Sequence, residues 1–333
     1  MKKLFTLFAV CCMAFNTGVG QITGSGKPIG EIFSDFHQKL DKSSGTNGFD
    51  VTRAYVGYGY VLDNNFSATV VINAAGSPDD MKNGSVRRRY AYLRYASLGW
   101  SNEKLSLAFG MTDTRIYSHQ QRWWGKRYIA GAMQSDNGHG VVADLGIVLD
   151  YKFSDKFSGD IAVMNGEGYL EKQLDDNVKT SLGFTVTPND NFIFRVYGDH
   201  YSVSNDQISP HIIPGKNQFT GTVFAAYKNK YFYVGAEYSY KSNADGILEH
   251  DSWGISTTNG VYLSEKSELF FRYDYLKSAQ RWDTRDGTFT IIGFQHTFSP
   301  NIRLSLNYQG TNPYYLGLIE SRNLIYLNAH FRF

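Results

Sequence analysis

Apolar residues fall on every second position in many windows along this chain. In FSATVVINA, residues 66–74, alternate positions from Phe66 are apolar, and Ser67, Thr69 and Asn73 lie between them. The window NIRLSLNYQ, residues 301–309, repeats the pattern. A period of two places apolar and polar side chains on opposite faces of a β-strand. These windows therefore predict strands with one dry face and one wet face.

Sixteen such windows recur, and the segments that connect them alternate in length. We expect strands to begin near residues 29, 49, 66, 88, 105, 141, 157, 178, 191, 217, 231, 250, 268, 286, 301 and 322. Short turns such as LDNN, SNEK and PNDN alternate with longer segments at 76–87, 114–140, 165–177, 203–216 and 279–285. Bacterial outer-membrane barrels have short turns on one side and long loops on the other. We therefore predict an all-β fold, an antiparallel transmembrane β-barrel of about 16 strands, with both termini on the periplasmic side.

The number and placement of the aromatic residues also favour a transmembrane barrel. The chain contains 24 Tyr and 23 Phe, and tyrosines gather toward strand ends, as in AYVGYGYV and RYDYL. This placement is typical of the aromatic girdles at the two membrane interfaces. A large soluble β-sandwich or propeller is the alternative, but it would need core-sized residues throughout its dry face, where many positions here are Ala or Gly.

The two ends of the chain are informative. Residues 1–20 combine Lys2 and Lys3 with a short apolar run and then small residues, which is the layout of a secretory signal peptide. We therefore expect residues 21–333 to form one barrel domain in the bacterial outer membrane. The chain ends in LNAHFRF, and we expect Phe331 and Phe333 to face lipid at the barrel seam. A terminal aromatic in this position resembles the signature that the barrel-assembly machinery recognises.

Removal of the signal peptide also removes both cysteines, and the formal net charge falls from +2 to zero. No thiolate metal site or disulfide then remains, and we expect neither a cofactor nor a metal. A neutral chain predicts no nucleic-acid partner. About sixteen strands leave a water-filled channel, whereas eight leave a lumen filled with side chains. Strand number therefore predicts a pore, and many alternating charges such as Asp144, Arg195 and Arg272 are expected to line it.

The connection at 114–140, TRIYSHQQRWWGKRYIAGAMQSDNGHG, is the longest and the third of the long ones. In sixteen-stranded porins a long third loop folds inward and narrows the pore, and we expect the same here. An external flap is the alternative. Within the segment, SHQQRWWGKRYIAG is expected to form a short helix, with Trp123 and Trp124 packing against the wall rather than serving as a sugar-binding surface.

Charge is unevenly distributed along the chain. Ten basic and two acidic residues lie between Lys82 and Arg127. Arginines beside a narrowing attract anions and bind phosphate or carboxylate through paired hydrogen bonds. For Arg87 and Arg89 a role in binding lipopolysaccharide phosphates outside the pore remains an equal alternative. The candidate pore-lining, anion-attracting residues are Arg53, Arg88, Arg94, Arg115, Arg122, Lys126 and Arg127.

Three segments together resemble the phosphate-selective porin family of Bacteroidetes-type bacteria. They are GFDVTRAYVGYGYVLDNNFSATVVINA, RRYAYLRYASLGWSNEKLSLAFGMTDT and GHGVVADLGIVLDYKFSDKFSGDIAVMNGEG, within residues 29–170. The resemblance implies a sixteen-stranded barrel, often a homotrimer, that passes anions, and Arg53 is the arginine of its first motif.

Three functions follow from these patterns. The first is an outer-membrane porin for passive diffusion of small hydrophilic solutes, anionic or neutral, with a modest preference for anions such as phosphate. The second is a non-conducting structural or secretion-partner barrel. The third is an outer-membrane hydrolase, which would need Ser, His and an orienting group on neighbouring outward positions. His296 and His330 fall on different strands, so we expect no enzyme. Outer-membrane lipid and lipopolysaccharide are expected to surround the barrel.

Overall fold

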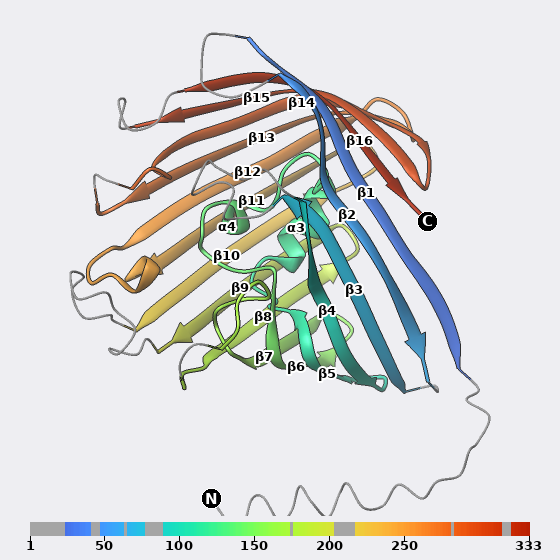
Figure 1. Ribbon diagram of the computed structural model, residues 1–333, viewed down its shortest axis with the longest axis vertical. Coiled ribbons are helices and arrows are strands. Elements are labelled where there is room, and N and C mark those ends of the chain that lie inside the picture. Colours follow the sequence, from blue (N-terminus) through green and yellow to red (C-terminus); the bar gives the residue numbers. More distant parts are fainter. Residues whose placement is uncertain are drawn as a thin grey trace, which may run out of the picture.

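The chain folds into one closed β-barrel in the computed structural model, which describes residues 24–40, 47–62, 65–76, 89–173, 176–202, 217–280, 283–314 and 321–333. The described part contains sixteen strands, each antiparallel to its neighbours in sequence, and β16 pairs with β1 to close the circle (Figure 1). The predicted signal peptide and the connections 77–88 and 203–216 lie outside the described residues.

The strands are β1 (Ser25–Lys39), β2 (Gly48–Val61), β3 (Phe66–Gly76), β4 (Arg89–Ser101), β5 (Leu105–Asp113), β6 (Ala143–Ser154), β7 (Phe157–Met164), β8 (Lys179–Asn189), β9 (Phe192–Tyr201), β10 (Gln218–Lys228), β11 (Phe232–Ser242), β12 (Ser252–Tyr262), β13 (Ser267–Ser278), β14 (Gly287–Ser299), β15 (Ile302–Pro313) and β16 (Arg322–Arg332). Two short helices, α3 (Ser118–Trp124) and α4 (Met133–Asp136), lie between β5 and β6. No helix among the described residues is long and apolar enough to cross a membrane.

The strand prediction is confirmed, and fifteen of the sixteen expected starts lie within two residues of the observed ones. The first strand is the exception, because it begins at Ser25 rather than near residue 29. Its early part includes Pro28 and pairs with β2, whereas the pairing with β16 begins only at Glu31. A proline is tolerated where one side of a strand has no partner.

The outer face carries the apolar belt that the alternation predicts. On β15, Ile302 and Leu306 are exposed, while Ser305 and Asn307 face the lumen and are buried. A soluble protein would not expose such a continuous apolar surface to water. The outer face is therefore the one that faces lipid.

Aromatic rings form the two predicted girdles. At the end with short turns, neighbouring rings lie 4.8 to 5.9 Å apart in a row formed by Tyr151, Phe153, Phe157 and Phe184. At the end with long loops, a second row is formed by Tyr238, Trp253, Tyr275 and Tyr314, with ring separations of 5.3 to 6.3 Å. Aromatic belts of this kind lie at the headgroup level of a bilayer, so the two rows mark the two membrane interfaces.

The last strand closes the barrel as expected. The amide of Phe333 donates to the Gly30 carbonyl at 3.0 Å, next to the ladder between β16 and β1. Phe331 and Phe333 are exposed on the outer face, and their rings lie 5.9 Å apart. The terminal aromatic therefore lies on the lipid face at the seam.

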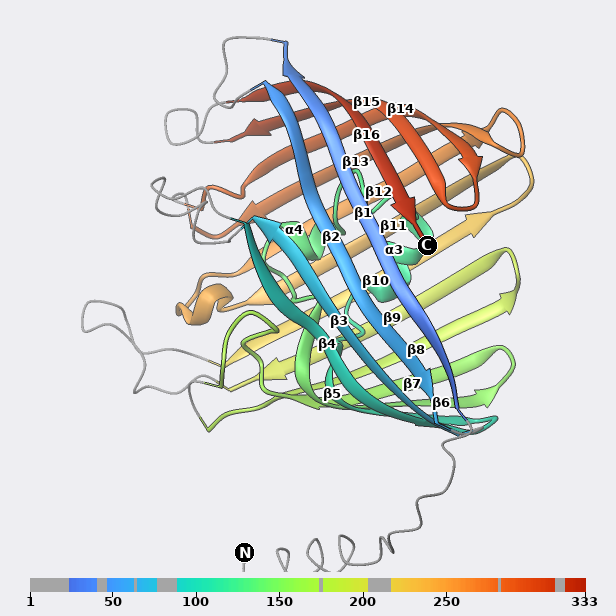
Figure 2. The same cartoon turned by 45° about the vertical axis from the view of Figure 1, so that its right-hand side comes forward.

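The connection 114–140 folds into the lumen, so the external-flap alternative is wrong. Both views show α3 and α4 inside the barrel (Figures 1 and 2). The helix expected over SHQQRWWGKRYIAG forms only over SHQQRWW, because α3 is capped at Gly125. The φ of Gly125 is 65°, a left-handed cap, and its N–H donates to the Gln121 carbonyl. Trp123 packs on Phe224 of β10 and Trp124 on Phe270 of β13, so both tryptophans pack against the wall.

Candidate functional site

Three arginines converge on one tyrosine inside the barrel. Tyr55 of β2 is buried, and Nη2 of Arg127, on the inward loop, donates to its hydroxyl at 2.7 Å. Nη1 of Arg53, two residues earlier on β2, lies 3.5 Å from the same oxygen. The guanidinium of Arg94, from β4, lies 5.3 Å from the Tyr55 ring centroid. We call Arg53, Arg94, Arg127 and Tyr55 the arginine cluster.

A β-bulge places Arg94 in this cluster. In the ladder with β3, Val71 pairs with Tyr95 and Ile72 pairs with Leu93, so Arg94 is the extra residue. The bulge turns both Arg94 and Tyr95 toward the lumen, where Nη2 of Arg94 donates to the Tyr95 hydroxyl at 3.2 Å. Tyr95 in turn donates to Asp113. Arg94 is 2 % exposed and its Nη1 has no hydrogen-bond partner.

The arginine cluster carries positive charge that no direct ion pair neutralises among the described residues. None of its three arginines has a carboxylate within ion-pair distance in the described part of the chain. Burial lowers the pKa of Arg127, and the nearby Arg94 and Arg53 lower it further. Such mutual repulsion is relieved by an anion, because each guanidinium presents several N–H donors to an oxyanion.

Two other predicted cations are already paired. Nζ of Lys126 lies 2.9 Å from Oε1 of Glu268 on β13 and donates to the Tyr233 hydroxyl at 2.8 Å. Arg115 binds Asp150 of β6 through Nε and Nη2, at 3.0 and 2.9 Å. These carboxylates neutralise both cations, so Lys126 and Arg115 add little to any attraction for anions.

The remaining two candidates differ in position. Arg122 on α3 is exposed to the lumen, and its Nε donates to the Ser118 carbonyl at 3.1 Å. Arg88 lies outside the described residues. Of the seven predicted residues, the structure therefore brings Arg53, Arg94 and Arg127 together and holds Arg115, Arg122 and Lys126 elsewhere on the inward loop.

The sequence interpretation missed the partners that organise these charges. The sequence pattern places Tyr55 only among the aromatic residues of a strand end. In the structure, its hydroxyl accepts from two arginines. Arg195, predicted to face inward, forms a buried pair with Asp160 of β7, with contacts of 2.6 and 3.0 Å. Arg272 binds Asp274 and also donates to the Gly131 carbonyl of the inward loop. Alternation gives the direction of a side chain but not its cross-strand neighbour.

Two cavities lie beneath the inward loop at the short-turn end. The first has a volume of about 640 Å³ and extends from the turn at Asn102 up to Tyr95 and Asp113, beside the arginine cluster. The second has a volume of about 420 Å³ and is lined by Trp123, Lys126 and residues of β9 to β15. His119 and Arg122 of α3 line both, so this helix separates them.

One outward-facing pair bears on the hydrolase alternative. Ser267 of β13 and His296 of β14 are cross-strand partners near the short-turn rim, with Oγ and Nδ1 2.8 Å apart. His296 also contacts the Phe298 ring, and no carboxylate or amide side chain holds its other nitrogen among the described residues. A nucleophile and a base without an orienting group do not make a catalytic triad. The described residues also contain no cluster of three or more His, Cys, Asp and Glu side chains that could hold a metal.

Comparison with known proteins identifies the fold. The chain is similar to Salmonella typhi OmpF, determined in complex with daunomycin, with a TM-score of 0.69 and 13% identity over 95% of this chain and 99% of that one. It is similar to the anion-selective porin from Comamonas acidovorans, with a TM-score of 0.65 and 12% identity over 93% and 100%. The outer membrane channel DcaP of Acinetobacter baumannii gives 0.65 and 11% over 96% and 100%.

These likenesses cover nearly the whole of each chain. The protein therefore has the sixteen-stranded fold of outer-membrane porins and channels. No protein-family model matches the sequence, and no curated protein matches it significantly.

Proposed function

We propose that this protein is an outer-membrane porin, a channel for passive diffusion of small hydrophilic solutes with a modest preference for anions such as phosphate. The arginine cluster carries the proposal, because three arginines without carboxylate partners lie in the lumen beside the inward loop. Charged rings at a constriction set the sign of selectivity in channels. The likeness to an anion-selective porin supports the same sign.

The proposed setting follows from the fold. The signal peptide would direct export, and the barrel would then lie in outer-membrane lipid and lipopolysaccharide. The barrel-assembly machinery would recognise Phe333. A homotrimer fits the family resemblance. Anions and neutral solutes would pass through the lumen beside the inward loop, by way of the cavity of about 640 Å³.

The test is the reversal potential of refolded protein in a planar bilayer under a KCl gradient, repeated with phosphate added. Wild-type protein should give stepwise conductance with a chloride-side reversal. Arg94→Glu should shift the reversal potential toward cations, because it replaces a positive charge of the cluster by a negative one. Lys230→Glu makes the same charge change on an exposed short turn and should leave the reversal potential at the wild-type value. An unchanged potential in Arg94→Glu would remove the cluster from the conduction path.

One observation favours a second candidate, a barrel that does not conduct. The inward loop contacts strands on opposite sides of the lumen, since Arg127 contacts Tyr55 on β2, whereas Gln134 donates to Glu237 on β11 at 2.7 Å. Tyr128 donates to Gln295 on β14 and stacks on His330 of β16. A silent bilayer from protein shown to be folded would favour a structural or secretion partner over a porin.

A further inference from the structure

We propose that the cavity of about 420 Å³ beneath the inward loop is a binding site for a small organic dianion that enters from the periplasm. We call this cavity the basic chamber. Its lining includes three cations, Arg122, Lys228 and Arg303, and the indole of Trp123. The proposal concerns binding alone, so it does not depend on conduction through the barrel.

The position of the chamber indicates the side of the membrane from which its ligand enters. Lys228 and Tyr233 flank the short turn between β10 and β11, and Tyr262 precedes the next short turn. Arg303 lies just after the short turn between β14 and β15. Because short turns mark the periplasmic end of such barrels, the chamber opens toward the periplasm.

The inner end of the chamber is closed by packed side chains. Trp124 packs with Phe270 and Ile291 in a dry cluster. Lys126 bonds to Glu268 and Tyr233 directly beside this cluster. The chamber is therefore a recess of the periplasmic mouth, separated by α3 from the cavity next to the arginine cluster.

The free groups of the chamber are hydrogen-bond donors. Nη1 of Arg303 donates to the Gly125 carbonyl at 3.1 Å and Nε of Arg122 to Ser118, which leaves their other N–H groups available. Lys228 lies 5.2 Å from the Trp123 ring centroid and has no ion-pair partner in the part of the chain that the structure describes. The buried Trp123 Nε1 has no hydrogen-bond partner.

The carboxylate of Glu268 and the amide oxygen of Gln295 already accept hydrogen bonds from neighbouring side chains. Glu268 accepts from Lys126 and, at 2.7 Å, from Gln295, whereas the Gln295 oxygen accepts from Tyr128 at 2.8 Å. A recess with free cations and N–H donors, whose carboxylate and amide oxygens already bind neighbouring groups, favours an oxyanion. Three cations without a carboxylate partner among the described residues favour a doubly charged ligand, and the volume leaves room for an organic body attached to the oxyanion.

A phosphate ester and a dicarboxylate share this chemistry, and calorimetry distinguishes them. Refolded full-length protein in detergent micelles at low salt is titrated with glucose 6-phosphate, succinate and, as the uncharged probe, glucose. We expect binding of one or both dianions and none of glucose. The absence of heat from both dianions would overturn the proposal.

Paired variants locate the site. Lys228→Gln with Arg303→Gln should weaken dianion binding by about tenfold or more, because two charge-assisted contacts are lost. Lys230→Gln with Lys266→Gln removes the same charge from neighbouring short turns without touching the chamber lining. An equal loss of dianion affinity in both double variants would mean that the overall positive charge of the barrel mouth attracts the dianion. That result would overturn the proposed binding site.

A milder change guards against a folding defect in the first double variant. Trp123→Phe keeps an aromatic ring against Phe224 and removes the Nε1 donor together with the second ring of the indole, over which Lys228 lies. It should weaken dianion binding by several-fold, on the order of one lost hydrogen bond. Wild-type affinity in this variant would exclude Trp123 from the site and count against the chamber. Folding is checked by the heat-dependent gel migration of the barrel.

Discussion

Lys126 on the inward loop and Glu268 on β13 form a buried ion pair, with Nζ and Oε1 2.9 Å apart. Lys126 is 3 % exposed and Glu268 7 % exposed. The pair ties the centre of the loop to the far wall of the lumen. One of the cations expected to attract solutes therefore serves to hold the constriction in place.

Breaking this pair should destabilise the barrel. Lys126→Met leaves Glu268 buried without its cation, which costs about 3 kcal/mol in buried pairs of this kind. We expect a lower urea midpoint, measured by tryptophan fluorescence of the refolded protein. Lys104→Met, at an exposed short turn, is the matched control and should stay near wild type. The double change Lys126→Met with Glu268→Leu should recover most of the loss, and failure to recover it would argue against the pair.

The inward loop should limit conductance. Deletion of residues 118–136 removes α3, α4 and the contacts of Lys126, Arg127 and Tyr128 with the wall. Single-channel conductance should rise, because about sixteen strands enclose a lumen wide enough for water once the loop is absent. Conductance at the wild-type level, from protein that still migrates as a folded barrel, would show that the narrowing lies elsewhere.

Much of this architecture could be predicted because alternation is a local property. The alternation within each strand shows which side chains face lipid. The strand positions and the seam at Phe333 can therefore be predicted from short stretches of sequence. The helix at SHQQRWW and the wall packing of Trp123 and Trp124 were also within reach, since the segment is long and aromatic. The length of the connection 114–140 pointed to its inward fold.

The ion pairs could not be predicted in the same way. Arg115 is neutralised by Asp150 and Lys126 by Glu268, and neither partner is close in sequence. The bulge at Arg94 also breaks the alternation, since Leu93 and Leu98 both face lipid although an odd number of steps separates them. Cross-strand register and bulges are tertiary features, which a period of two does not encode.

The selectivity should depend on pH through Asp136. Burial raises the pKa of this α4 carboxyl to about 6, although Arg272, Arg53 and Arg127 oppose the rise. As the pH falls from 7 to 5, Asp136 gains a proton and the lumen loses one negative charge near the arginine cluster. The reversal potential should therefore move toward anions as the pH falls.

The control for this pH effect is Asp136→Asn, compared with Glu237→Gln, which removes another lumen carboxyl that the inward loop contacts. The reversal potential of Asp136→Asn should lie close to the acidic value and change less across the same range. His119 and His139 do not compete, because burial lowers the pKa of each to about 3. A pH dependence that survives in Asp136→Asn would assign the titration to another group. The measurement is a series of reversal potentials in matched KCl gradients at pH 7, 6 and 5.

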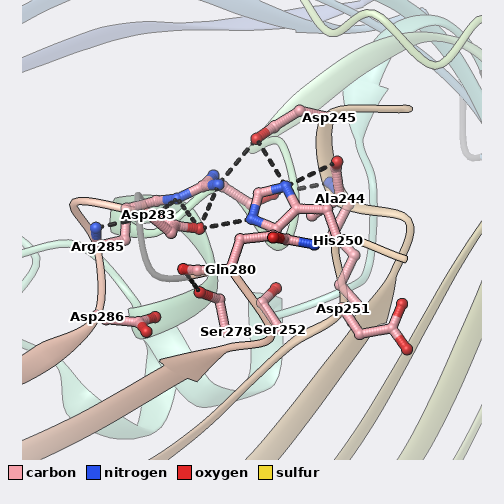
Figure 3. Close-up of polar contacts among 12 residues, drawn as sticks. Ala244, Asp245, His250, Asp251, Ser252, Ser278, Gln280, Asp283, Arg285 and Asp286 are labelled. Atoms are coloured by element: carbon pink, nitrogen blue, oxygen red, sulfur yellow. Dashed lines mark hydrogen bonds and ion pairs between the residues drawn. The ribbon is translucent and has the colours of Figure 1, made fainter. Parts of the chain in front are cut away.

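The long-loop ends of β11 to β14 are held together by a network of polar contacts that should control the mobility of their loops. Nε2 of His250 lies 2.9 Å from Asp283, and Arg285 binds both Asp283 and, at 2.8 Å, Asp245 (Figure 3). His250 is fully buried, and Asn243, Asp245 and Glu249 around it have φ between 47° and 60°. Residues other than glycine hold this backbone only when their surroundings fix it.

Arg285→Gln should release the loop at 243–249, because it removes the cation that links Asp245 to Asp283. Burial alone would raise the pKa of Asp283, but hydrogen bonds from Arg285 hold this pKa below its ordinary value, so the network should persist through neutral and mildly acidic pH. Limited proteolysis with an enzyme that cleaves after acidic residues should cut the variant at Asp245 or Glu249 several times faster than wild type. Lys277→Gln removes a cation that pairs with Asp286 outside this network and should be cut at the wild-type rate. Equal rates for all three proteins would mean that the loop is held by its backbone contacts instead.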